Sequence, residues 1–202
     1  YKYLGMLSVL ISADLLAQEI PDYKGEYVFT NSKVSMRGIR ELITHEEEGK
    51  RTIQFNAKFP LGRIKIISDF IEENNLISST QYYVDAKVLI RSDKRTLSYD
   101  QSSGTLTSKG KFEWSQTLLK NENVFDPLNV QIQIRKNIIA GLKDFSLMLP
   151  DLKTGAIEAN NYKVVDSSSF EVDGTVYPCI IVERFRLQDN RTTRYFLSLI
   201  HI

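Results

Sequence analysis

The sequence predicts a mainly β domain with minor α content, built as a curved antiparallel meander that forms a half-barrel or open barrel. Three observations support this fold class. Apolar and polar residues alternate over residues 51–59, turn-forming pairs separate further alternating segments, and one capped apolar segment at 127–141 interrupts them. Such alternation is typical of a strand with one buried and one solvated face. We expect the helix at 127–141 to cover the concave face of the sheet.

The clearest strand covers residues 51–59, where apolar residues occupy every second position. A Pro-Leu-Gly turn at 60–62 leads into a second alternating segment at 64–70. Short alternating segments separated by Glu-Gly, Asn-Asn, Ser-Gly and Asp-Gly pairs favour consecutive hairpins. Further predicted strands cover residues 26–31, 34–44, 76–84, 95–99, 111–114, 162–165 and 176–187.

The segment 126–141 has the signals of a helix. Asp126 and Pro127 fit the N-cap and first helical positions, and Gly141 fits a left-handed helix end. One helical stripe consists of Leu128, Ile132, Ile139 and Leu142. Apolar residues also alternate over 128–134, which leaves a strand as the alternative. The caps and the length favour a helix over 127–141.

Composition and charge exclude several classes of protein. The 202 residues include 26 Lys and Arg against 25 Asp and Glu, so no net field attracts nucleic acid or an anionic membrane. The single cysteine, Cys179, excludes an internal disulfide and lies in an apolar stretch typical of a buried, inert thiol. We expect no nucleic-acid partner and no transmembrane segment in the mature chain.

The two ends of the chain predict processing and truncation. Residues 1–17 resemble a secretory signal peptide, with Lys2 before an apolar core and Ala17 before polar residues. The alternative is a buried N-terminal helix. Export would place the protein in the periplasm or cell envelope of a Gram-negative bacterium. Residues 197–202 match the translation of a common sequencing adapter, so we expect one envelope domain over 18–196, truncated at its C-terminus.

The sequence contains no constellation typical of an enzyme. His45, before three glutamates, lacks the second histidine of the common zinc sites, so a solvated hairpin end is the favoured interpretation. Neither a nucleophile elbow nor a phosphate-binding loop is present. We therefore predict a non-enzymatic protein with no catalytic residues, metal or cofactor.

Large apolar side chains are the candidate ligand-binding residues. A strongly curved sheet can enclose a cavity, and an apolar lining suits a lipid-like ligand. The alternative is that these side chains form a packed core. The candidates are Phe55, Phe59, Ile66, Phe70, Tyr83 and Trp114.

The order of segments resembles the bacterial envelope family known as domain of unknown function 3108. The resemblance rests on Tyr27-Val28-Phe29, Gly38, Asp126-Pro127-Leu128, Tyr162-Lys163-Val164, Tyr177-Pro178-Cys179 and residues 191–196. It implies a curved antiparallel sheet with helices in its concavity, similar to periplasmic lipoprotein carriers of the Lol type. It implies no catalytic residues. Tyr195 and Phe196 stand where many relatives have a tryptophan.

Together these features predict a periplasmic binding or carrier module for a lipid-like apolar ligand. The alternative is a structural or interaction module in envelope assembly, which would bind a protein partner and have a fully packed core. An enzyme that depends on His45 is the third option.

Overall fold

The computed structural model describes residues 20–30, 35–73, 75–119, 122–172, 174–186 and 191–198. The predicted signal peptide at 1–17 and residues 199–202 lie outside the described residues. Within them the chain forms two antiparallel sheets and one α-helix, which confirms the mainly β fold with minor α content.

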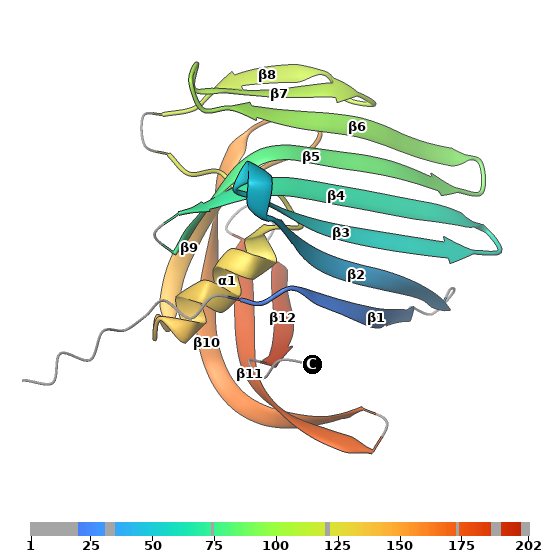
Figure 1. Cartoon of the computed structure of the whole chain (residues 1–202), viewed down its shortest axis with the longest axis vertical. Helices are drawn as coiled ribbons and strands as arrows, with labels where there is room; N and C mark the ends of the chain where they lie inside the picture. The colour runs from blue at the N-terminus through green and yellow to red at the C-terminus, as the bar shows by residue number, and fades with distance from the viewer. Residues whose placement is uncertain are drawn as a thin grey trace, which may run out of the picture.

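The first sheet is a meander of eight strands that follow one another in chain order (Figure 1). Its edges are β1 and β8, so the sheet is open. The short 3-10 helix η1 (Glu46–Glu48) connects β2 to β3. The strands are β1 (Tyr23–Thr30), β2 (Ser35–His45), β3 (Lys50–Phe59), β4 (Gly62–Glu73), β5 (Leu76–Val88), β6 (Arg91–Asp100), β7 (Thr105–Gly110) and β8 (Trp114–Thr117).

The second sheet has four strands in the order β12-β11-β10-β9. In Figure 1 its strands run steeply across the direction of the first sheet, and the β10–β11 hairpin extends beyond it. Its strands are β9 (Asp144–Pro150), β10 (Ile157–Val172), β11 (Thr175–Arg186) and β12 (Arg191–Ser198). Residues 197 and 198 pair with β11 as part of β12.

The predicted helix is confirmed as α1 (Val130–Ile139), and it packs on the concave face of the first sheet. The side chain of Asp126 accepts hydrogen bonds from the backbone N–H groups of Leu128 and Asn129, at 2.8 and 2.9 Å. These bonds form a turn over residues 126–129 before the helix. The N-cap is Asn129, with no capping side-chain hydrogen bond, so the prediction of Asp126 as N-cap and Pro127 as first helical residue is wrong by three positions. The helix ends before Leu142, which is 47% exposed and therefore does not continue the apolar stripe.

One apolar core lies between the first sheet, α1 and the second sheet. Strand alternation builds it, because every second residue of β3 faces inward. Gly38 shows how tightly the core packs, since a Cβ at this position would lie 2.3 Å from ring atoms of Phe55. Fully buried members from the two sheets and the helix are Leu42, Ile53, Phe70, Ile77, Leu97, Leu106, Ile132, Ile134, Tyr162 and Val182.

Three strands differ from the sequence prediction. The strand expected at 111–114 is wrong, because residues 111 and 112 form a bend and β8 begins at Trp114. Gly110, at a φ of 108°, and the hydrogen bond from Lys111 N to Lys94 O form this bend. The strands β7 and β9 were not expected. In β7 Leu106 is the only large apolar residue, so its alternation is weak.

Candidate functional site

The predicted ligand-binding residues belong mainly to the core. Phe55 and Phe70 are 5% and 0% exposed on the concave face of the first sheet. Phe55 pairs across the strands with Ile66, which is half-buried, as is Phe59 further along β3. The structure therefore brings these four residues onto one face and packs the two phenylalanines against their own chain.

The other two predicted residues lie elsewhere. Tyr83 is half-buried on the opposite face of β5, because its neighbours Tyr82 and Val84 are the buried residues of that strand. Trp114 is half-buried on the edge strand β8, and its indole N–H donates to Leu152 O at 3.4 Å. The six residues do not form one site.

A different hollow is the candidate site. It is a half-open cleft of about 380 Å³ between the start of α1, the β9–β10 connection and strands β6, β11 and β12. This volume lies at the lower end of the range typical of small-molecule sites. The cleft is lined by Arg95, Pro127, Val130, Gln131, Leu149, Pro150, Asp151, Leu152, Lys153, Glu158, Asn160, Arg184 and Tyr195.

The cleft combines an apolar wall with two guanidinium groups. Pro127 and Val130 from the helix start face the apolar side chains of Leu149 and Leu152 across it. The guanidinium of Arg95 already has hydrogen-bond partners within the protein. It pairs with Asp93, and its Nη1 donates to Leu152 O at 2.8 Å. These contacts leave Arg95 as a fixed part of the wall.

Arg184 and Lys153 are the lining cations that form no ion pair among the described residues, and Arg184 is half-buried whereas Lys153 is exposed. Arg184 Nη2 lies 3.5 Å from Thr193 Oγ1, and the guanidinium also interacts with the Tyr162 side chain. The guanidinium lies 6.0 Å from the centroid of the Tyr195 ring. Because no carboxylate pairs with Arg184 among the described residues, its guanidinium can donate to an anionic or carbonyl oxygen of a ligand in the cleft.

A buried hydrogen-bond network fixes the helix start beside the cleft. Ser68 Oγ donates to Asp126 Oδ2 at 2.6 Å, and Asn129 Nδ2 donates to Ser79 Oγ at 2.9 Å. Burial raises the pKa of Asp126 to about 7, although the hydrogen bond from Ser68 and those from the backbone of Asn129 and Leu128 oppose the rise. The network joins the loop before α1 to strands β4 and β5.

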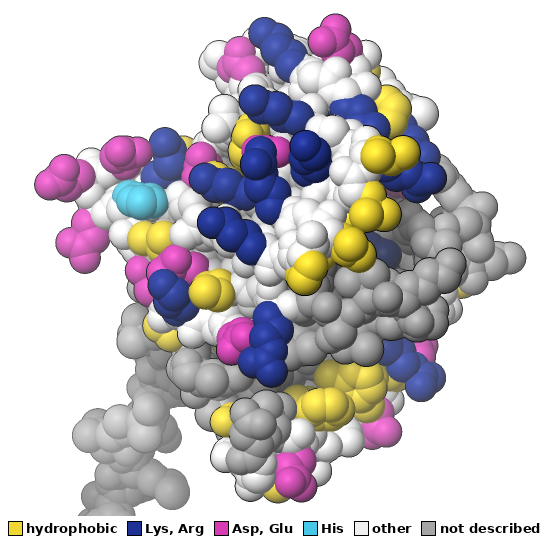
Figure 2. All heavy atoms as spheres, turned by 90° about the vertical axis from the view of Figure 1, so that its right-hand side faces the viewer, with side chains coloured by type: hydrophobic (Ala, Val, Ile, Leu, Met, Phe, Trp, Pro, Cys, Tyr) yellow, Lys and Arg dark blue, Asp and Glu magenta, His cyan; other side chains and the backbone are white. Residues whose placement is uncertain are grey.

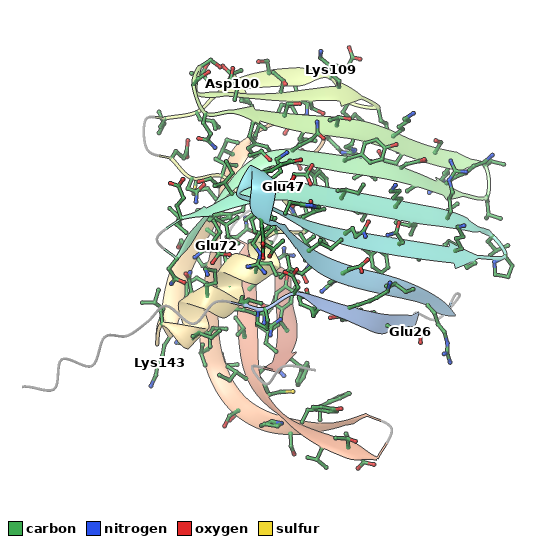
Figure 3. All side chains as sticks on the ribbon, in the orientation of Figure 1. Glu26, Glu47, Glu72, Asp100, Lys109 and Lys143 are labelled. Atoms are coloured by element: carbon green, nitrogen blue, oxygen red, sulfur yellow. The ribbon has the colours of Figure 1, made fainter. Side chains whose placement is uncertain are left out.

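A second buried polar cluster holds the middle of the helix. Glu72, labelled in Figure 3 beside α1, pairs with Lys136 and, at 2.8 Å, with Arg51. Lys136 and Arg51 are almost fully buried. Burial alone would raise the pKa of Glu72, but hydrogen bonds from Lys136 and Arg51 outweigh it and lower the pKa. The cluster is an internal ion-pair contact between β3, β4 and α1.

The histidine-carboxylate cluster lies on the outer surface. His45 is exposed, and its Nε2 lies 3.0 Å from Thr52 Oγ1. Figure 3 labels Glu47 in the adjacent 3-10 helix, which contains no buried residue. Within the described part of the chain, no three His, Cys, Asp or Glu side chains come together as metal ligands.

Sequence reasoning missed the cleft because its walls come from distant segments. Arg184, on β11, is one of many arginines, and nothing in its neighbourhood in the chain distinguishes it. Asp126-Pro127, noticed as a helix start, was the one signal near the cleft.

Comparison with protein-family models, curated proteins and solved structures finds no match to this chain. The resemblance to the domain of unknown function 3108 family therefore stays a prediction. In the described ranges there is no helix with the length and apolar character needed to cross a bilayer.

Proposed function

We propose that the protein is a non-catalytic binding module that holds a small acidic amphiphile in the cleft beside α1. The observation that carries the proposal is the Arg184 guanidinium in the wall of the cleft, which forms no ion pair among the described residues. A ligand carboxylate or phosphate would accept from Arg184, while its apolar body would lie on Pro127, Val130 and Leu149.

The proposal moves the expected lipid-like ligand from the concave face to this cleft. Phe55 and Phe70 pack into the core, so the concave face offers them no cavity to line. The cleft volume of about 380 Å³ suits a short-chain amphiphile rather than a whole diacyl lipid. We also propose the bacterial envelope as the compartment, on the basis of the N-terminal sequence pattern alone.

Calorimetric titration with monomeric decanoate tests the proposal. Decanoate should bind, whereas decanol, which lacks the acid, should bind more weakly. Arg184→Gln should weaken decanoate binding about tenfold or more, because it removes a hydrogen bond to a charged group. Circular dichroism would establish that this variant is folded.

Arg194→Gln is the matched control. Arg194 lies on the neighbouring strand β12, is exposed, and pairs with Glu183 at 2.6 Å outside the cleft. Its removal should leave decanoate binding unchanged. Absence of decanoate binding to the parent, or equal binding by the parent and Arg184→Gln, would contradict the proposal.

An interaction module in envelope assembly is the second candidate function. The specific observation is a set of exposed phenylalanines in the second sheet, with Phe170 at 55%, Phe185 at 38% and Phe196 at 53%. Exposed aromatic side chains in such numbers are typical of a surface that binds a partner. Native mass spectrometry distinguishes the candidates, because a carrier should retain an amphiphile and a scaffold should retain none.

A further inference from the structure

Two neighbouring hairpins of the first sheet present large apolar side chains at their ends. Leu61 in the β3–β4 turn is 45% exposed, and Leu89 and Ile90 in the β5–β6 turn are 61% and 99% exposed. A hydrogen bond of 2.8 Å from Leu89 N to Leu61 O joins the two turns. In Figure 1 these hairpin ends lie together on the right, away from α1.

The backbone conformation of the β5–β6 turn does not favour the apolar residues Leu89 and Ile90 that occupy it. Val88 pairs with Arg91, so Leu89 and Ile90 form a two-residue loop. Leu89 has a φ of 54°, in the left-handed region. Two-residue loops with this backbone favour Gly and Asn, and a leucine there is strained. Leucine and isoleucine therefore occupy this turn at a cost to folding.

Basic side chains collect on the sheet face next to these turns. Lys58 lies opposite Arg63, and Arg63 lies opposite Lys87, which places three cations side by side across β3, β4 and β5. In the next row Lys65 and Lys94 flank Asp85. All five cations are exposed.

Within the described residues this basic group is neutralised only at Arg63. Asp85 pairs with Arg63 at 3.1 Å, and the four lysines of the group form no ion pair there. Like charges directly opposite one another destabilise a sheet, so folding does not explain the arrangement. The whole chain has a net charge of only +1, so this group is a local concentration of positive charge on a nearly neutral protein.

Figure 2 looks onto the ends of the hairpins. Dark-blue basic side chains gather there beside a row of yellow apolar side chains, while magenta acidic side chains project mainly at the periphery. The cyan histidine and the acidic side chains around it lie to the left of the basic group. We call the five cations Lys58, Arg63, Lys65, Lys87 and Lys94 the basic collar. Apolar hairpin ends next to this collar match the apolar interfacial layer and the negatively charged headgroup layer of an anionic bilayer.

We propose that the ends of the β3–β4 and β5–β6 hairpins dock this protein onto a bilayer that contains anionic phospholipid. Leu61, Leu89 and Ile90 enter the interfacial region, and the lysines of the collar contact the headgroup phosphates. The occupant is a lipid surface because exposed apolar turns next to lysines without ion pairs among the described residues complement both the apolar interfacial layer and the negative headgroups of such a bilayer. The proposal stands on residues separate from the cleft and does not depend on a ligand there.

Vesicle flotation with the full chain tests this docking. The vesicles would contain phosphatidylcholine alone, or phosphatidylcholine with about a quarter phosphatidylglycerol to supply negative surface charge. We expect binding to the anionic vesicles to exceed binding to the neutral ones. Sodium chloride at 1 M, where the Debye length is about 3 Å, should remove most of the difference.

Two variants separate the contributions. Leu89→Gly combined with Ile90→Asn installs a favourable hairpin turn, so the melting temperature should stay the same or rise while binding falls about tenfold. Lys58→Gln combined with Lys87→Gln removes two cations. Each cation contributes about fivefold to binding, so this double variant should bind anionic vesicles about 25-fold more weakly.

Matched controls use exposed residues outside the hairpin ends. Lys143→Gln combined with Lys163→Gln removes the same charge from two other exposed lysines, and Figure 3 labels Lys143 at the opposite end of the molecule. Leu119→Asn removes an apolar side chain that is 74% exposed after β8. Both controls should bind vesicles like the parent.

The proposal would be overturned if the hairpin and collar variants bind anionic vesicles like the parent. That result would assign any vesicle binding to another part of the chain, such as the apolar run at 3–11. Absence of vesicle binding by the parent would also overturn it. So would a lysine variant that binds anionic vesicles like the parent but binds an acidic protein more weakly than the parent does.

Discussion

Phe70 and Phe170 each occupy a long strand, yet the first is fully buried and the second is 55% exposed. Phe70 lies on the concave face of the eight-stranded sheet, which α1 and the second sheet cover. Phe170 lies near the end of the β10–β11 hairpin, where it contacts Phe196 at a ring-centroid distance of 6.2 Å. The same side chain is therefore core in one sheet and surface in the other.

This difference indicates which region of the molecule contributes most to the stability of the fold. The inward face of the first sheet supplies the largest share of the buried apolar side chains, and hydrogen bonds and ion pairs at Asp126 and Glu72 join it to α1 and the loop before the helix. The outer half of the second sheet extends past this core (Figure 1). We infer that stability resides in the first sheet and its helix, whereas the outer hairpin contributes surface for contacts with other molecules.

The largest expected effect is the loss of stability in Phe70→Ala. Removing a fully buried phenylalanine should lower the free energy of unfolding by about 3–5 kcal/mol. Phe170→Ala, the matched change in the second sheet, should alter it by less than about 0.5 kcal/mol. Urea denaturation measures both. Equal losses in the two variants would break the comparison between the sheets.

The next effect is a pH dependence that comes from Asp126. Its folded-state pKa of about 7, raised by burial, lies above the ordinary aspartate value of 3.8, so the unfolded state releases the proton more readily. Stability should therefore fall as pH rises from about 4 to 7, by about 4 kcal/mol for a pKa difference of about 3. Urea denaturation across this pH range measures the slope.

Asp126→Asn is the control for this slope. Asparagine keeps an acceptor for the backbone N–H groups of Leu128 and Asn129 but does not titrate. The variant should lose the decline between pH 4 and 7 and should be more stable than the parent above pH 7. An unchanged pH profile would show that Asp126 is not the group responsible.

The smallest effect tests packing at the edge of the first sheet. Gly38→Ala places a Cβ 2.3 Å from the Phe55 ring, so the ring must move, at a cost of about 1–3 kcal/mol. Gly25→Ala, on the neighbouring strand β1, meets only the Tyr27 ring at 3.3 Å and should cost less than about 0.5 kcal/mol. Thermal denaturation monitored by circular dichroism compares the two. Similar melting temperatures for both variants would indicate a loosely packed edge.

Local patterns predicted the fold class and several elements. The alternation at 51–59 correctly predicted β3, and the apolar pattern within 127–141 correctly predicted a helix, although α1 begins at Val130 and not at Pro127. The same reasoning missed β9, because its alternation is short and its burial depends on the second sheet. It also placed Tyr83 among the ligand-binding candidates of the concave face, since two adjacent tyrosines do not reveal which one faces inward.

The sequence by itself determined which residues of a strand share a face and that one helix lies within 127–141, because both follow from backbone geometry over a few residues. Tertiary structure alone decided that Arg184 of β11 meets Pro127 and Leu149 in one cleft. It also placed Leu61 beside Leu89 at the hairpin ends. These contacts join segments far apart in the chain, and alternation within a segment carries no information about which faces will meet.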